Sequence, residues 1–137
     1  MTVNLTEAER NGTNMAKYEK AFRGDFDNFV NTMDQWIVNA SASANLEDGS
    51  NYRCQGFRCA VRVFERYSII GSNRVSLSMT VVSDGDVLFV SVITSGGSQA
   101  VFFKINTLGE ESFLETAINA IEDYIQRYGA PLSPLPY

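Results

Sequence analysis

Residues 75–93 read VSLSMTVVSDGDVLFVSVI, and this stretch decides the fold. On each side of Asp84-Gly85, apolar side chains recur at every second position, which is the period of a β-strand with one buried face. An Asp-Gly pair between two such runs indicates a two-residue type I′ turn. We therefore expect an antiparallel hairpin in which Ser83 pairs with Asp86. The pairs on its core face are then Val81 with Leu88, Met79 with Val90, and Leu77 with Val92.

A further strand, at residues 57–63, precedes this hairpin and alternates in the same way. We expect a three-residue loop, Gly71-Ser72-Asn73, which pairs Ile70 with Arg74. In this register Val63 lies on the core face, and its even-numbered neighbours lie on the second face of the sheet.

The same register places Glu65 on the core face, opposite Met79. An unpaired carboxylate there would be strongly unfavourable. A β-bulge near Glu65 that turns its side chain outward is the preferred solution. A functional buried acid is the alternative, because acids with strongly shifted pKa values gather at functional sites.

Two amphipathic helices flank these strands. Residues 25–38 carry apolar side chains at helical spacing, and Asp25 is a suitable N-cap. Residues 107–128 form a second apolar stripe, which begins with the capping-box pattern Thr107-x-x-Glu110. Further strands are expected at residues 16–22, 42–46 and 101–105.

These elements follow the order β-α-β-β-β-β-β-α and predict an α+β two-layer sandwich. Its antiparallel β-sheet has two amphipathic helices packed on one face. The chain of 137 residues suits one domain, which we place at residues 15–129. Residues 1–14 are polar and aperiodic and are expected to be a disordered extension. Residues 130–137 contain all three prolines and are expected to form a Pro-rich tail.

Charge and composition exclude several classes of protein. The formal net charge of -5 argues against nucleic acid and against an anionic membrane surface as partners. No apolar run is long enough to span a bilayer, and no secretory signal is visible, so we expect a cytoplasmic protein.

The residues that usually carry catalysis or bind metals are scarce. The chain has no histidine, which removes the commonest general base and the commonest metal ligand. Cys54 and Cys59 stand five apart, without the further ligands that a metal site needs, and are expected to be free thiols. We therefore assign no catalytic residue, no metal and no cofactor.

The second face of the predicted sheet is the candidate site, because it combines cations with a large apolar area. It is interpreted as a homodimer interface, or as a pocket for a small anionic or amphipathic ligand. The structural alternative to both is a solvated face whose large side chains cover one another or lie under the C-terminal tail. The candidate residues are Arg58, Arg62, Phe64, Arg66, Ser78, Phe89, Ser91 and Ile93.

No arrangement of residues in the sequence identifies an activity. The favoured hypothesis is a non-enzymatic cytosolic module that binds a partner or associates with itself through the second face. One alternative is a carboxylate-dependent enzyme that uses Glu65. Another is a protein of helix-grip type that binds a small anion or an apolar ligand.

Three stretches carry a resemblance to a known family: RCAVRVFERY at residues 58–67, GSNRVSL at 71–77 and ITSGGSQAVFFKINTLGEE at 93–111. They resemble a family of small bacterial proteins that is catalogued only as a domain of unknown function. The resemblance extends over about residues 15–128. It implies a bacterial cytosolic protein of one compact domain, with no established activity and no catalytic residues to carry over.

Overall fold

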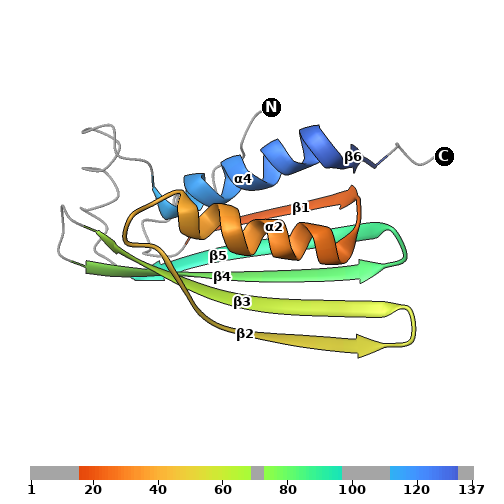
Figure 1. Cartoon of the computed structure of the whole chain (residues 1–137), viewed down its shortest axis with the longest axis horizontal. Coiled ribbons are helices and arrows are strands. Elements are labelled where there is room, and N and C mark those ends of the chain that lie inside the picture. The colour runs from red at the N-terminus through yellow and green to blue at the C-terminus, as the bar shows by residue number, and fades with distance from the viewer. Residues whose placement is uncertain (1–15, 69–72, 97–111, 133–137) are drawn as a thin grey trace.

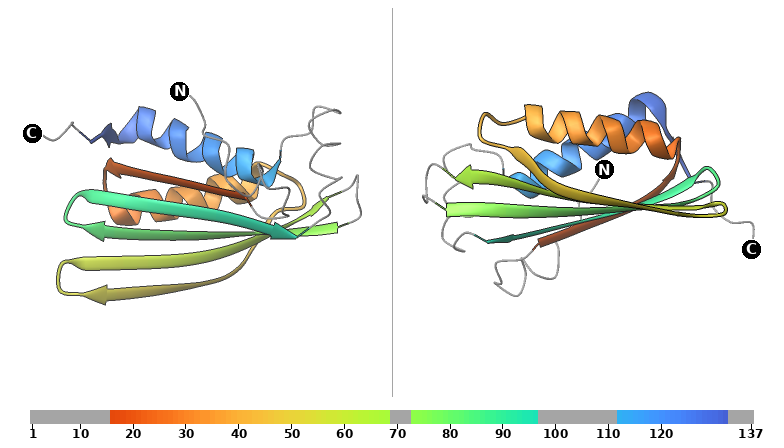
Figure 2. Two further views of the ribbon diagram at one scale, coloured as in Figure 1. Left: turned by 180° about the vertical axis from the view of Figure 1, so that it is seen from behind. Right: turned by 60° about the horizontal axis from the view of Figure 1, so that its bottom comes forward.

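In the part of the chain that the structure describes, six antiparallel strands form one sheet, and two helices lie on the same face of it (Figures 1 and 2). The computed structural model describes residues 16–68, 73–96 and 112–132. The strand order is β2-β3-β4-β5-β1-β6. The elements are β1 (Ala16–Arg23), α2 (Phe26–Asn39), β2 (Asn45–Cys54), β3 (Phe57–Ser68), β4 (Asn73–Asp84), β5 (Val87–Gly96), α4 (Phe113–Tyr128) and β6 (Ala130–Pro131).

The predicted α+β two-layer fold is confirmed. The strand expected at residues 101–105 lies outside the described residues, and the sixth strand of the described sheet is the short β6 after α4. β6 pairs with the end of β1, so Ala130 and Pro131 of the segment predicted as a tail belong to the sheet edge.

Helix α2 forms where the sequence predicts it. The Asp25 carboxylate accepts a hydrogen bond from the backbone N–H of Asn28 at 2.8 Å, which satisfies one of the free donors at the helix start. The apolar stripe then faces the sheet, and its members are Phe26, Phe29, Val30, Met33 and Ile37.

Helix α4 begins at Phe113, where the Ser112 hydroxyl oxygen accepts a hydrogen bond from the backbone N–H of Glu115 at 3.1 Å. The capping box predicted at Thr107-x-x-Glu110 lies outside the described residues. The predicted stripe is buried at Leu114, Ala117, Ile118, Ile121 and Ile125, whereas its last member, Tyr128, is exposed.

The β4–β5 hairpin differs in register from the prediction, although its faces agree. Asp84 pairs with Val87, so the turn residues are Gly85 and Asp86. Gly85 has a φ of 65°, whereas Asp86 is not among the described residues with positive φ. A positive φ at the first turn residue alone is the type II′ pattern, which favours glycine at that position. The slip is two positions, which leaves every side chain on its predicted face.

The core therefore contains the side chains predicted for it. Leu77, Met79, Val81, Leu88, Val90 and Val92 are fully buried. Helix α2 packs mainly on β2, β3 and β4, whereas α4 packs mainly on β1, β4, β5 and β6. No helix in the described part of the chain has the length and apolar character needed to cross a bilayer.

Aromatic rings join the two helices to the sheet. The Phe29 ring lies 4.9 Å from that of Phe22 and 5.0 Å from that of Tyr124, both in edge-to-face geometry. Such a pair contributes about 0.5–1.5 kcal/mol beyond its buried area. These contacts fix α2, α4 and β1 against each other, and in the described part of the chain no helix lies on the opposite face of the sheet.

Candidate functional site

The register of β3 corrects the predicted site. Ser68 pairs with Asn73, and Val63 pairs with Ser78, which is a displacement of three positions from the prediction. Because side chains alternate along a strand, an odd displacement turns each one to the other face. The prediction was therefore wrong for four candidate residues, which point toward the helices: Arg58, Arg62, Phe64 and Arg66.

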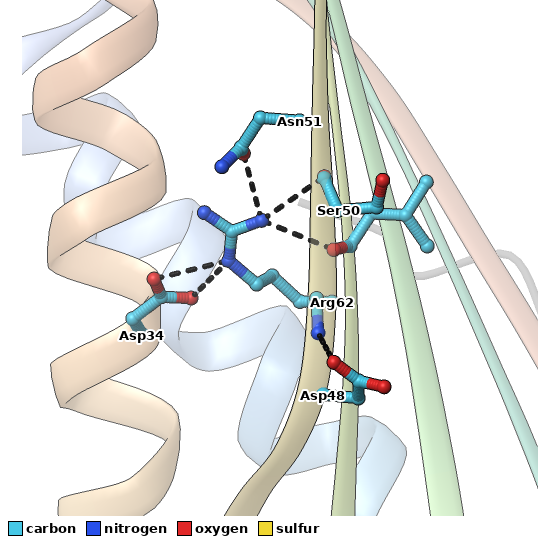
Figure 3. Close-up of polar contacts among 7 residues, drawn as sticks. Asp34, Asp48, Ser50, Asn51 and Arg62 are labelled. Atoms are coloured by element: carbon cyan, nitrogen blue, oxygen red, sulfur yellow. Dashed lines mark hydrogen bonds and ion pairs between the residues drawn. The ribbon is translucent and has the colours of Figure 1, made fainter.

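Arg62 connects three elements beneath α2 (Figure 3). Its Nε donates to both carboxylate oxygens of Asp34 in α2, at 3.1 and 3.2 Å. Its Nη1 donates to Asn51 Oδ1 at 2.9 Å and to the carbonyl of Ser50 at 3.3 Å, both in β2. Arg62 is 9% exposed, so these bonds satisfy the Nε and Nη1 donors of an almost fully buried residue.

Gly49 makes room for this arginine. It is the register partner of Arg62 in β2. A Cβ at Gly49 would lie 2.9 Å from Arg62 Cδ and 3.1 Å from its Nη1, which is closer than side chains normally approach. The missing side chain allows the Arg62 stem to cross β2.

Arg58 forms a second connection between β3 and α2. Its Nη2 lies 2.6 Å from Asp27 Oδ1, and its guanidinium carbon lies 4.5 Å from the centre of the Phe26 ring. The hydrogen bond from Arg58 lowers the pKa of the Asp27 carboxyl below its ordinary value. Further along β3, Arg66 lies over the Phe113 ring of α4, at 5.0 Å.

The spacing of these ion pairs explains how α2 is aligned. Asp27 and Asp34 are seven residues apart, which is about 10 Å along a helix. Arg58 and Arg62 are four apart, which is about 13 Å along a strand. The two pairs match only if α2 runs parallel to β3. We interpret Arg58 and Arg62 as structural residues whose charges are neutralised within the chain.

The face of the sheet opposite the helices, here called the outer face, carries the other predicted residues. Ser78, Phe89, Ser91 and Ile93 lie on it together. Phe89 is 38% and Ile93 37% exposed. These four residues are therefore brought together as predicted, without the arginines.

Four cross-strand rows make up the outer face from β2 to β1, numbered here from the β2–β3 bulge toward the hairpin ends. They are Asp48-Val63-Ser78-Ile93-Lys17, Ser50-Val61-Thr80-Ser91-Glu19, Tyr52-Cys59-Val82-Phe89-Ala21 and Cys54-Phe57-Asp84-Val87-Arg23. In the first three rows, no residue of β3, β4 or β5 is charged. Sequence reasoning missed Cys59, Val61 and Val63, because β3 carries apolar residues at both odd and even positions and its alternation fits either face.

Charged side chains surround this uncharged centre, and several of them are paired with one another. Lys17 and Glu19 on β1 approach to 3.8 Å. Arg23 lies 3.2 Å from Asp86 at the hairpin end. At the opposite end, Arg74 contacts Glu65, and it lies 3.4 Å from Glu47. The rim of the outer face therefore contains both signs of charge.

Glu65 lies on this rim and not in the core. It is the register partner of Asn45 and Ser76, and its carboxylate pairs with Arg74. The predicted outward direction of Glu65 is correct, but the predicted bulge near it in β3 is wrong, because the irregularity lies in the neighbouring strand β2, between Leu46 and Asp48. The hypothesis of a carboxylate-dependent enzyme required a buried acid at Glu65, and Glu65 is not buried.

A polar contact under α4 was missed by sequence reasoning. The Tyr18 hydroxyl of β1 donates to the Glu122 carboxylate of α4, and Lys20 Nζ lies 3.9 Å from the same carboxylate. Burial and the neighbouring carboxylate raise the pKa of Tyr18 above its ordinary value. The neutral phenol therefore ties α4 to β1. The one signal in the sequence for this contact was the position of Tyr18 on an apolar strand face.

The described residues contain no cluster of three or more Cys, Asp or Glu side chains suited to a metal ion. Cys54 and Cys59 are free thiols. They are diagonal neighbours on the outer face, since Cys54 pairs with Phe57 and Cys59 with Tyr52. Diagonal neighbours are separated by about 7–8 Å, which exceeds the usual Cα separation of a disulfide.

The fold and this site define a class: a two-layer α+β protein with one helix-covered sheet face and one outer face that carries no helix in the described part. Residues 15–125 match the family of unknown function DUF6054. The chain therefore belongs to this family. No curated protein matches it in sequence.

Solved structures of three proteins are similar to the chain. A protein of unknown function from Pseudomonas aeruginosa, PA94, has 9% identity and a TM-score of 0.50, over 99% of this chain and 83% of that one. The hypothetical protein jhp0584 from Helicobacter pylori has 10% identity and a TM-score of 0.46, over 92% and 93%. Protein Ms6760 from Mycobacterium smegmatis has 10% identity and a TM-score of 0.40, over 92% and 97%. At 9% identity the likeness to PA94 concerns the fold alone.

Proposed function

We propose that this chain is a non-enzymatic cytoplasmic module that forms a homodimer through its outer face. The proposal rests on one observation: an uncharged centre, with half-exposed apolar side chains, lies within a rim that carries charges of both signs. A protein interface has this anatomy, with apolar and aromatic residues at the centre and polar residues at the rim.

A second copy is the occupant that the charges favour. A surface shaped for a strongly acidic or basic partner would carry a surplus of the opposite sign, whereas the rim carries both. In a twofold dimer the same patch meets itself, so each charged side chain needs an opposite charge within its own surface. The rim supplies both members of such pairs.

The size of the outer face sets the expected strength. Five strands span roughly 20 Å, and four rows along the strands span roughly 20 Å more. The projected area of the outer face is therefore about 400 Å², and its accessible area is larger because the surface is pleated. Stable interfaces bury about 800 Å² of accessible surface per partner, which the outer face approaches at most. We therefore expect association of moderate strength, with a Kd in the micromolar range.

A small anionic or amphipathic ligand is a less favoured occupant of this face. It was expected to use Arg58, Arg62 and Arg66, and these side chains point toward the helices. On the outer face such a ligand would meet mainly hydroxyl and apolar groups.

Sedimentation velocity from low to high micromolar concentration tests the proposal. Wild type is expected to shift toward the dimer mass, whereas Phe89→Arg places a charge at the centre of the face and should remain monomeric. Asn119→Arg is the matched control, because it adds the same charge at an exposed position of α4 and should behave like wild type. A monomeric wild type, or a natively folded Phe89→Arg variant as dimeric as wild type, would refute the proposal.

A further inference from the structure

We infer that the two copies pack face to face about a twofold axis that runs along β4, with the β1 side of one copy on the β2 side of the other. This inference rests on the proposed homodimer. It adds the orientation of the partner and the two residues that determine it, Lys17 and Asp48.

Symmetry limits the choice of orientations. Two identical sheets that meet through the same face are related by a twofold axis that lies between them. When the strands of the two sheets stay roughly aligned, as in aligned sheet packing, this axis runs either along the strands or across them. In the order β2-β3-β4-β5-β1, β4 is the middle strand of the face. An axis along β4 therefore places each row on the same row of the partner, in reverse order.

The charges favour this axis. Row one begins with Asp48 on β2 and ends with Lys17 on β1. Reversed on itself, the row places each Asp48 against the partner's Lys17, which gives two opposite-charge contacts per dimer. The apolar centre also matches, because Val63 meets the partner's Ile93 and Cys59 meets the partner's Phe89.

The other axis brings like charges together. An axis across the strands lays β1 on the partner's β1 in the opposite direction, so that Lys17 faces the partner's Arg23. Two such contacts oppose association, since like charges across an interface are unfavourable. Asp48 then faces the partner's Cys54 and loses a charged partner. The axis along β4 has one like pair, Asp84 with the partner's Asp84, at the exposed hairpin end.

The twist of the sheets does not remove the Lys17–Asp48 contact. Aligned sheets cross at about 30°, which displaces residues at the rim by about 5 Å relative to the flat case. A lysine side chain of four methylene groups reaches over that distance. The contact is therefore available to exposed side chains on both strands, since Lys17 and Asp48 are both exposed.

Charge reversal tests the orientation, with Kd measured by sedimentation at low salt for Lys17→Glu, Asp48→Lys and the double variant. Each single change places two like pairs in the dimer and should raise Kd about tenfold. The double variant restores opposite charges and should return Kd to within about threefold of wild type. Far-UV circular dichroism and Tm confirm that each variant is folded.

The outcomes separate this inference from the homodimer itself. If Lys17→Glu strengthens association, the axis runs across the strands and the inference is wrong. If the charge variants leave Kd unchanged, or the double variant is as weak as the singles, the orientation is wrong as well, while the loss of the dimer in Phe89→Arg still supports self-association. A wild type that stays monomeric overturns both.

Discussion

Replacing Arg62 with methionine removes the guanidinium that joins α2 to the β2–β3 hairpin. Methionine keeps most of the aliphatic stem, so the change isolates the polar contacts. It deletes two hydrogen bonds to Asp34 and those to Ser50 and Asn51. It also leaves the Asp34 carboxylate without its cation.

The expected loss of stability follows from burial. Removing one partner of a fully buried ion pair costs about 3–5 kcal/mol. The Asp34 side chain is 21% exposed, so water recovers part of this loss. We expect the free energy of unfolding to fall by about 2 kcal/mol, which corresponds to a Tm decrease of about 6 °C for a chain of this size.

Urea denaturation, followed by far-UV circular dichroism and by the fluorescence of Trp36, measures this change. Arg53→Met is the control, because Arg53 is an exposed arginine of β2 and its replacement should change stability by less than about 0.5 kcal/mol. The double variant Arg62→Met/Asp34→Ala has no unpaired carboxylate and should recover about 1 kcal/mol relative to the single variant. An Arg62→Met protein as stable as Arg53→Met would show that this network does not hold α2 to the sheet.

Three further predictions address the fold. Phe64→Ala should cost about 3–5 kcal/mol in urea denaturation and Phe89→Ala less than about 1 kcal/mol, because only Phe64 is in the core. A Phe64→Ala variant that loses no more stability than Phe89→Ala would mean that β3 faces the other way. Gly49→Ala should destabilise by about 1–2 kcal/mol, since its Cβ would lie 2.9 Å from a side-chain carbon, whereas Gly56→Ala, with nothing within 4 Å, should be near neutral in the same assay. Tyr18→Phe should lose about 1 kcal/mol at neutral pH. Because the folded state raises the pKa of Tyr18, the stability it adds is present below its ordinary pKa of 10.0 and declines above it, so the difference in Tm between wild type and this variant should narrow at alkaline pH.

The helices and the core face of the β4–β5 hairpin could be predicted because their signals are local. Asp25 and the residues after it carry both the N-cap and the apolar period, and both recur in the structure. The predicted register of the hairpin differs from the observed one by two positions, because an Asp-Gly pair does not reveal which two residues occupy the turn. A register difference of an even number of positions leaves each side chain on the same face, so the prediction that Met79 and Val90 lie in the core is correct.

The face of β3 could not be predicted, because its pattern is ambiguous. Apolar residues occupy both sets of alternating positions, with Val61 and Val63 on one face and Ala60 and Phe64 on the other. The arginines at the even-numbered positions favour exposure of the face that carries Ala60 and Phe64. Their burial becomes favourable only when Asp27 and Asp34 of α2 lie above them, which is a tertiary contact. Half of the candidate site was therefore assigned to the wrong face, and the half on β4 and β5 was correct.

The position of β2 at the edge of the sheet has a consequence for local opening. Among the described strands, β2 has one neighbour, β3, and all ten of its residues are exposed. Little apolar surface must be hydrated to detach it, so its amide protons should exchange with solvent at a lower free energy than those of β4. The hydrogen bonds from Arg62 to Ser50 and Asn51 then hold the middle of β2 against β3. Fraying is expected to begin at both ends of β2 and to stop at this arginine. Because Arg62 also binds Asp34 of α2, local opening of the edge strand is coupled to the packing of α2 on the sheet.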